Sequence, residues 1–327
     1  MIDDCVLNFF SMVRGFIVLL LAISCWRCDG FSVAGYLPEW RHRLLDEDHE
    51  DRLQRICSTL THMIFFSLQV DSTGNIAALD RWPSEDRMQR VRSVCQGSLG
   101  TKVLVCFGGN SRSDGFSAVV ASPEKRQSFL GHLKDFLAKH QLDGIDWNWE
   151  YPNSKEDWEG LSLLINEMRI SMPSMVQTMA YYPDGRQENI ISHFQLDKSL
   201  NLIHMMAYDQ PHQHSTFEFA KKSIASALEN GFGNKATLGL PFYARHVKTG
   251  DWKTYEDVLK SGPLKEHADS IGEYYFNGPR TIQRKTVLAI ENHLAGVMIW
   301  ESGQDSPDGD LHLAIQAGIQ NQEKKEL

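Results

Sequence analysis

Eight short apolar segments, spaced along almost the whole of this 327-residue chain, limit its possible folds more than any other feature. Each is bounded by Gly, Pro or polar residues, which is typical of buried β-strands. The predicted strands cover residues 32–37, 61–68, 102–107, 144–149, 176–181, 202–208, 237–240 and 296–300. Apolar residues at helical spacing predict helices between several of them, over residues 123–140, 158–172, 217–229 and 281–293. Buried strands joined by helices form parallel sheets, and eight of them match a closed (β/α)8 barrel, the TIM barrel.

No repeat, low-complexity tract or linker divides the sequence after residue 30. The chain length would allow two domains, but one α/β barrel uses about 250 residues. The longest interval between predicted strands runs from Pro241 to Ala295 and contains one helix and an aromatic loop. We therefore predict a single α/β barrel over residues 31–327, without a large inserted domain.

The first thirty residues resemble a secretory signal peptide. Arg14 precedes the apolar run 15–22, which is too short to span a bilayer, and polar residues follow near Asp29. An uncleaved anchor starting near Val6 would place Arg14 in the hydrocarbon at a cost of about 2.5 kcal/mol or more. We predict cleavage near residue 30 and secretion, with no stable membrane association afterwards. The C-terminal KKEL resembles an ER retention signal but lacks its acidic second residue, so retention is the less favoured alternative.

The overall charge argues against two classes of partner. Lys and Arg number 33 against 42 Asp and Glu, which gives a net charge of −9, and no basic cluster is visible. Nucleic acids and anionic membranes are bound through clustered Lys and Arg, so neither partner is expected. The hydrophobic content of 42% is that of a folded globular protein, which we expect to be a monomer.

Three of the six cysteines follow residue 30, namely Cys57, Cys95 and Cys106. They allow one internal disulfide at most, and Cys57 with Cys95 is the favoured pair because Cys106 lies in an apolar strand. The cysteine spacing matches no zinc signature, and the close pair His212 and His214 is interpreted as loop histidines. We expect neither a metal nor a cofactor.

The fourth predicted strand, which reads DGIDWNWEYP from residue 143, carries the residues of greatest chemical interest. Side chains alternate along a strand, so Asp146, Asn148 and Glu150 share one face while Trp147 and Trp149 share the other. The aromatic face is expected to pack against helices, which leaves the polar face inside the barrel. Buried carboxylates are costly, and a catalytic role explains them. Glu150 falls at the carboxyl end of the strand, where active sites of this fold assemble.

This strand resembles the D-x-x-D-x-D-x-E signature of the family 18 glycoside hydrolases, the chitinases and their relatives. Asp143, Asp146 and Glu150 match the signature, whereas Asn148 replaces its third Asp. Cys106 stands where the family often has Ser, and we interpret it as structural. Five further motifs follow the family's order, each at a predicted strand: Gly35-Tyr36, Gly108-Gly109, Met206-Ala-Tyr208-Asp209, Gly239-Leu-Pro241-Phe-Tyr243 and Gly296-Val-Met-Ile-Trp300.

The resemblance implies hydrolysis of β-1,4-linked N-acetylglucosamine with retention, in which the acetamido oxygen of the sugar serves as the nucleophile. Chitin or its oligomers would be the partner. Glu150 would be the general acid and then the base, in a catalytic group with Asp146, Asn148 and Tyr208. Tyr208 would bind the acetamido carbonyl. The remaining expected sugar contacts are Asp209, Trp300 as the floor of the site, Tyr36, Tyr243 and Trp40.

Asn148 bears on how active such an enzyme would be. In the family, the Asp at this position orients the acetamido group, opposes the positive charge of the intermediate and keeps the pKa of the acid high. An amide can orient the group but supplies no charge, and loss of one electrostatic stabiliser costs about 10²- to 10³-fold in rate. We expect a weakened chitinase, with Glu150 less basic than where Asp is present. A chitin-binding lectin and another N-acetylglucosaminyl hydrolase remain the alternatives.

Overall fold

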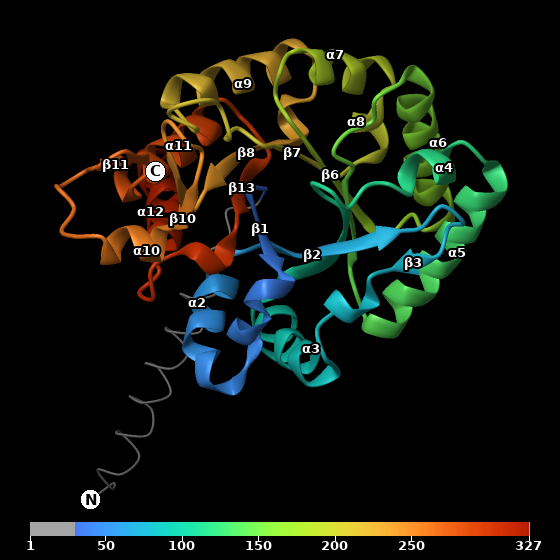
Figure 1. Cartoon of the computed structure of the whole chain (residues 1–327), viewed down its shortest axis with the longest axis horizontal. Coiled ribbons are helices and arrows are strands. Elements are labelled where there is room, and N and C mark those ends of the chain that lie inside the picture. Colours follow the sequence, from blue (N-terminus) through green and yellow to red (C-terminus); the bar gives the residue numbers. More distant parts are fainter. Residues whose placement is uncertain (1–29, 327) are drawn as a thin grey trace, which may run out of the picture. The chain divides into compact units, whose positions relative to one another are not determined.

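Eight parallel strands close into a barrel in this computed structural model, which describes residues 30–326 (Figure 1). Their order around the barrel is β1-β13-β8-β7-β6-β5-β4-β2, and pairing of β1 with β2 closes the ring. The barrel strands are β1 (Ser32–Pro38), β2 (His62–Val70), β4 (Lys102–Gly108), β5 (Gly144–Asn148), β6 (Val176–Tyr181), β7 (Leu202–Met205), β8 (Ala236–Pro241) and β13 (Gly296–Trp300). The short β3 (Ile76–Ala77) pairs antiparallel with β2. The predicted barrel is confirmed, and the predicted leader lies outside the described residues apart from Gly30.

Helices follow most strands and lie around the barrel in Figure 1. Ser122, Ser154 and Thr216 precede α5, α6 and α9, and the side-chain oxygen of each accepts a hydrogen bond from the backbone N–H three residues later. Such N-caps satisfy an amide that the helix itself leaves unpaired. The α-helices are α2 (Glu50–Thr59), α3 (Glu85–Val91), α4 (Phe116–Val120), α5 (Pro123–His140), α6 (Lys155–Ser171), α7 (Arg186–His193), α8 (Leu196–Ser199), α9 (Phe217–Glu229), α10 (Tyr255–Lys260), α11 (Pro279–Glu291) and α12 (Asp310–Glu326).

The interval between β8 and β13 holds more structure than the sequence predicts. Besides α10 and α11 it forms a four-stranded antiparallel sheet in the order β10-β9-β12-β11. These strands are β9 (Tyr243–His246), β10 (Trp252–Thr254), β11 (Ser270–Ile271) and β12 (Tyr274–Tyr275). Strands of two to four residues are too short to show an alternating pattern, which explains why this small sheet was missed. It does not amount to a large inserted domain, in agreement with the prediction.

Two predicted strands end earlier than expected. The strand predicted over 202–208 ends at Met205, and the strand predicted over 144–149 ends at Asn148. Tyr208 and Glu150 therefore lie in the loops just beyond the carboxyl ends of β7 and β5. This is the end of the barrel at which the fold assembles its active sites.

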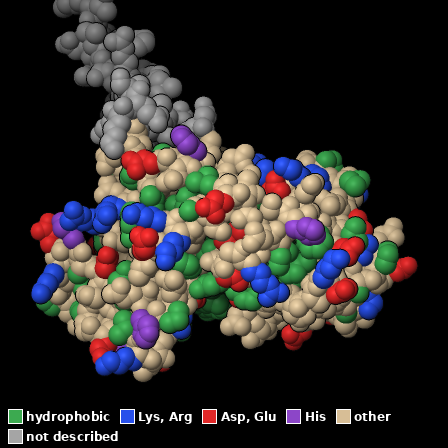
Figure 2. Space-filling model, turned by 90° about the horizontal axis from the view of Figure 1, so that it is seen from above, with side chains coloured by type: hydrophobic (Ala, Val, Ile, Leu, Met, Phe, Trp, Pro, Cys, Tyr) green, Lys and Arg blue, Asp and Glu red, His purple; other side chains and the backbone are tan. Residues whose placement is uncertain are grey.

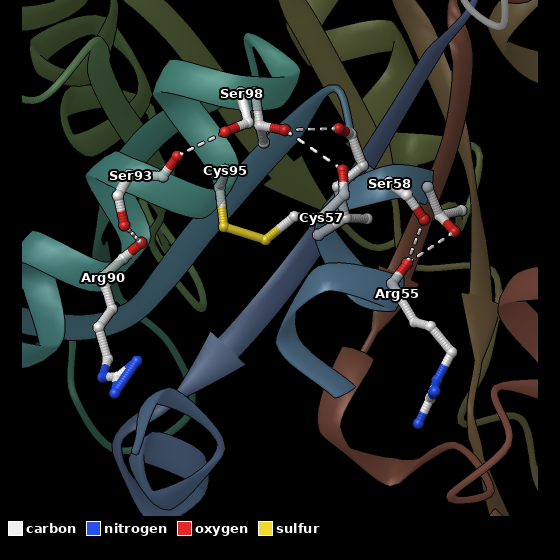
Figure 3. Close-up of a disulfide and its surroundings, with 10 residues drawn as sticks. Arg55, Cys57, Ser58, Arg90, Ser93, Cys95 and Ser98 are labelled. Atoms are coloured by element: carbon white, nitrogen blue, oxygen red, sulfur yellow. Dashed lines mark hydrogen bonds between the residues drawn. A yellow bond between two sulfur atoms is a disulfide. The ribbon is translucent and has the colours of Figure 1, made fainter. Parts of the chain in front are cut away.

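The predicted disulfide between Cys57 and Cys95 is present (Figure 3). It joins α2 to the helical turn 92–97 across a sequence separation of 38 residues. Cys106 is buried in β4 as a free thiol, as its apolar surroundings predicted.

Acidic and basic side chains are interspersed on the face of the molecule drawn in Figure 2. Among the described residues, no helix combines the length and the apolar character that crossing a bilayer requires.

Candidate active site

The two faces of β5 point as the alternation predicts. Trp147 is fully buried and lies 6.2 Å from Phe129 of α5, measured between ring centroids. Trp149 stacks on Phe116 of α4 at 5.1 Å. The aromatic face thus packs against helices, and the polar face, with Asp146 and Asn148, lies inside the barrel.

Asp146 lies beneath the mouth of the barrel and is fully buried. Its carboxylate accepts hydrogen bonds from the hydroxyls of Tyr36, at 2.8 Å, and Thr178, at 2.6 Å. The Cys106 thiol is a third partner. Burial raises the pKa of Asp146, and these three hydrogen bonds partly offset that rise by favouring the ionised form. Because these three hydrogen bonds occupy the carboxylate oxygens, Asp146 supports the site from below and does not bind a substrate directly.

Glu150 lies two residues beyond the end of β5, and its backbone N–H donates to the Ser113 hydroxyl oxygen at 3.2 Å. Burial raises the pKa of its carboxyl group to about 7, and the negative charge of Asp209 adds to the rise. Hydrogen bonds from the Asn148 side chain and the Asn110 backbone act in the opposite direction. A carboxyl group with this pKa is protonated in about half of the molecules at neutral pH, as a general acid requires.

Asn148 lies between these two carboxyl groups along β5. Its side chain hydrogen-bonds Glu150, but its Oδ1 is buried and has no partner within the described part of the chain. A buried acceptor without a donor is costly unless a ligand supplies one. Asn148 therefore presents an acceptor to whatever enters the site.

Tyr208 and Asp209 lie in the loop after β7. Among residues 30–326, the Tyr208 hydroxyl has only the Met298 sulfur as a hydrogen-bond partner, at 3.8 Å, and sulfur is a weak acceptor. Asp209 is held more firmly, because its Oδ1 accepts from the Tyr243 hydroxyl at 2.7 Å and from the Arg245 guanidinium at 2.8 Å. The Tyr208 hydroxyl is thus free to bind a substrate, whereas Asp209 is fixed by the small sheet.

These side chains surround a cavity of about 300 Å³ at the barrel mouth. Trp300, at the end of β13, forms part of its wall, with its ring 4.7 Å from Phe66 and 5.4 Å from Tyr36. The cavity is lined by Tyr36, Phe66, Asn110, Asn148, Glu150, Tyr151, Tyr182, Met206, Tyr208, Asp209 and Trp300. Aromatic rings suit the apolar faces of sugars, and the polar side chains of Asn148, Glu150 and Asp209 line the same cavity.

Six of the eight residues predicted for the site line this cavity. The other two are Asp146, which lies beneath it, and Tyr243, which contacts Asp209 from behind. Trp40, a further expected sugar contact, is 47% exposed, and its indole N–H donates to Glu301 at 3.3 Å. The lining residues that sequence reasoning missed are Phe66, Asn110, Tyr151, Tyr182 and Met206. Four of the five, Asn110, Tyr151, Tyr182 and Met206, stand just beyond the carboxyl end of a barrel strand, and that position was the available signal. Phe66 instead lies within β2, where it pairs with Pro38 at the end of β1.

Comparison with known proteins decides the family. The model of the family described as Glycosyl hydrolases family 18 matches residues 32–305. The chain belongs to this family. Two solved family 18 structures resemble it: the chitinase ChiB of Flavobacterium johnsoniae is 26% identical, with a TM-score of 0.73, and covers 89% of this chain and 94% of its own. A chitinase from Bacteroides thetaiotaomicron is 25% identical, with a TM-score of 0.75, and covers 88% of this chain and 96% of its own.

Among curated relatives of this family 18 protein, Probable chitinase 2 of Drosophila melanogaster is 26% identical. The match covers 68% of this chain and 49% of the relative, so the chain spans about half the length of that protein. Within the described residues of the family 18 barrel, no group of three or more His, Cys, Asp or Glu side chains is arranged to hold a metal ion.

Proposed function

We propose that this family 18 protein is a retaining chitinase that cleaves β-1,4-linked N-acetylglucosamine, with Glu150 as general acid and base. The observation that carries the proposal is the Glu150 carboxyl group, whose pKa is raised to about 7 in an aromatic cavity at the barrel mouth. The relatives named as chitinases favour an enzyme over a lectin.

The neighbouring carboxylates support a mechanism in which the substrate supplies its own nucleophile. A conventional retaining glycosidase needs a second free carboxylate about 5 Å from the acid. Asp146 is fully buried beneath the cavity, with three hydrogen-bond partners, and Asp209 is engaged by Tyr243 and Arg245. Neither is free to attack a sugar, so the acetamido oxygen takes that role. Glu150 then protonates the leaving oxygen and afterwards activates water.

The remaining residues orient the sugar. The free Tyr208 hydroxyl would donate to the acetamido carbonyl, and the unpartnered Asn148 Oδ1 would accept from the acetamido N–H. Trp300 would support the sugar ring, with Tyr36 below it. Asn148 supplies no charge against the positive intermediate, so we propose a turnover about 10²- to 10³-fold below that of a site with Asp.

The partners of the protein would be chitin or N-acetylglucosamine oligomers. We also propose that the protein is secreted after cleavage near residue 30. It would be a monomer without stable membrane association.

The test uses wild type and Glu150→Gln with chitohexaose. Wild type should release shorter oligomers, detected by mass, whereas Glu150→Gln should bind the hexamer with similar affinity and release none. Glutamine keeps the shape of the acid, but its amide group cannot transfer a proton to the leaving oxygen. If both proteins bind the hexamer and neither cleaves it, the protein is a lectin and the proposal is wrong.

A further inference from the structure

The loop that joins β7 to α9, residues 206–216, carries Tyr208 and Asp209 and contains two residues in an unfavourable backbone conformation. Asp209 and His212 have φ angles of 64° and 66°, in the left-handed region that residues with a side chain seldom adopt. Such conformations persist only where the surrounding structure holds them in place. The loop must therefore be fixed by contacts outside itself.

The two ends of the loop are tied together at its base. The Ser215 hydroxyl donates to the carbonyl oxygen of Ala207 at 3.1 Å, and the backbone N–H of Gln210 donates to the carbonyl oxygen of His214 at 3.0 Å. Ala207 immediately precedes Tyr208, so the position of Ser215 determines where the backbone of Tyr208 and Asp209 lies.

Lys285, on α11, holds Ser215. Its side chain is fully buried, and its ammonium group donates to the Ser215 carbonyl oxygen at 3.0 Å, the Ser215 hydroxyl oxygen at 2.7 Å and Asn277 Oδ1 at 2.7 Å. Asn277 completes the arrangement by donating from Nδ2 to the same Ser215 carbonyl at 2.9 Å. All three donors of the ammonium group are used.

The three partners of Lys285 are neutral, which makes the burial of its charge costly. Burial lowers the pKa of Lys285 to about 7, against a smaller opposing effect of Asp269. An apolar side chain of the same length would fill this space without that cost. An apolar side chain would not, however, form the hydrogen bonds by which the ammonium group holds Ser215 at the base of the 206–216 loop.

We propose that Lys285 is a positioning residue of the reaction, which holds the base of the 206–216 loop and thereby fixes Tyr208 and Asp209 against the sugar. The catalytic part of this inference rests on the proposed function. Lys285 does not line the cavity and touches no substrate; it acts through Ser215.

Lys235 offers a matched control. It too donates to backbone carbonyl oxygens, those of Asp197 in α8 and of Leu200, the residue that ends this helix. This segment precedes β7, at the opposite end of the barrel from the cavity. Lys235→Met removes comparable hydrogen bonds without touching the 206–216 loop.

The test compares wild type, Lys285→Met and Lys235→Met by hydrogen exchange and kinetics, well below the melting temperature of each. In Lys285→Met, amides of residues 206–216 should exchange about tenfold faster or more, whereas Lys235→Met should leave them unchanged. On chitohexaose, Lys285→Met should lower kcat about tenfold or more with little change in KM, because Trp300 still binds the sugar while the reacting group is misplaced. Lys235→Met should lower stability only.

A Lys285→Met protein with normal exchange in the loop and a normal kcat would overturn the proposal, even if its melting temperature fell. If Lys285→Met does not fold, Ser215→Ala, which removes one partner of the ammonium and the tie to Ala207, must show the same two changes. Wild type that fails to cleave chitohexaose would instead refute the proposed function, and the exchange comparison would still decide whether Lys285 fixes the loop.

Discussion

At the scale of one residue, burial and a neighbouring negative charge together raise the pKa of Glu150, the proposed general acid. Its carboxyl group is withdrawn from water at the end of β5, next to the negative charge of Asp209, and both effects disfavour ionisation. Asn148 and Asn110 donate hydrogen bonds that moderate the shift. The raised pKa of Glu150 therefore does not depend on a carboxylate at position 148.

The pH dependence of activity should follow Glu150. The reaction needs its protonated form, and its pKa of about 7 means that this form disappears as the pH rises through 7. We expect kcat/KM for chitohexaose to fall about tenfold per pH unit well above pH 7, because this limb reports the free enzyme. A kcat/KM that stays flat from pH 6 to pH 9 would contradict the role of Glu150.

The variant Asn148→Asp tests what the amide costs. A carboxylate here would restore charge against the positive intermediate and oppose ionisation of Glu150. Turnover should therefore rise about 10²- to 10³-fold, and the alkaline limb should move to higher pH. Asn148→Ala, which removes the orienting amide as well, should be slower than wild type. An Asn148→Asp variant with neither a faster turnover nor a shifted pH profile would refute this explanation.

At the scale of elements, the sequence predicted which side chains share a face of a single strand, but it did not predict contacts between residues on two different strands. The alternation along β5 correctly assigned the inner and outer faces. Thr178, which binds Asp146, was not found because only the register between β5 and β6 places the two residues side by side. Tyr243 was predicted as a sugar contact, and its hydrogen bond to Asp209 was not foreseen, since β9 belongs to a small sheet that no sequence pattern revealed.

The disulfide between α2 and the turn 92–97 should matter for stability alone. It closes a loop of 38 residues in the unfolded chain, so replacing Cys57 and Cys95 together by Ala should lower the free energy of unfolding by about 2–4 kcal/mol. Neither residue lines the cavity, and kcat should be unchanged. Urea denaturation with a parallel assay measures both; a large loss of kcat in a folded protein would show that the link also shapes the site.

At the scale of the whole molecule, barrel closure brings together side chains that are distant in sequence. Tyr36 on β1 and Trp300 on β13 lie in neighbouring strands, and Asp146 reaches Tyr36 across the interior. The eight apolar runs were enough to predict this closure, since strands buried on both faces have few other arrangements. They could not predict the loops that complete the cavity, because loop conformations depend on contacts such as those of Lys285.

The proposed function requires that Glu150 acts as the acid in a cleavage of chitin that retains the anomeric configuration. A proton NMR time course of chitohexaose digestion reports this configuration, because the anomer of each new reducing end is visible before it equilibrates. Wild type should release the β anomer first, and Glu150→Gln should release nothing. If wild type releases the α anomer first, or does not cleave chitohexaose, the proposed function is wrong.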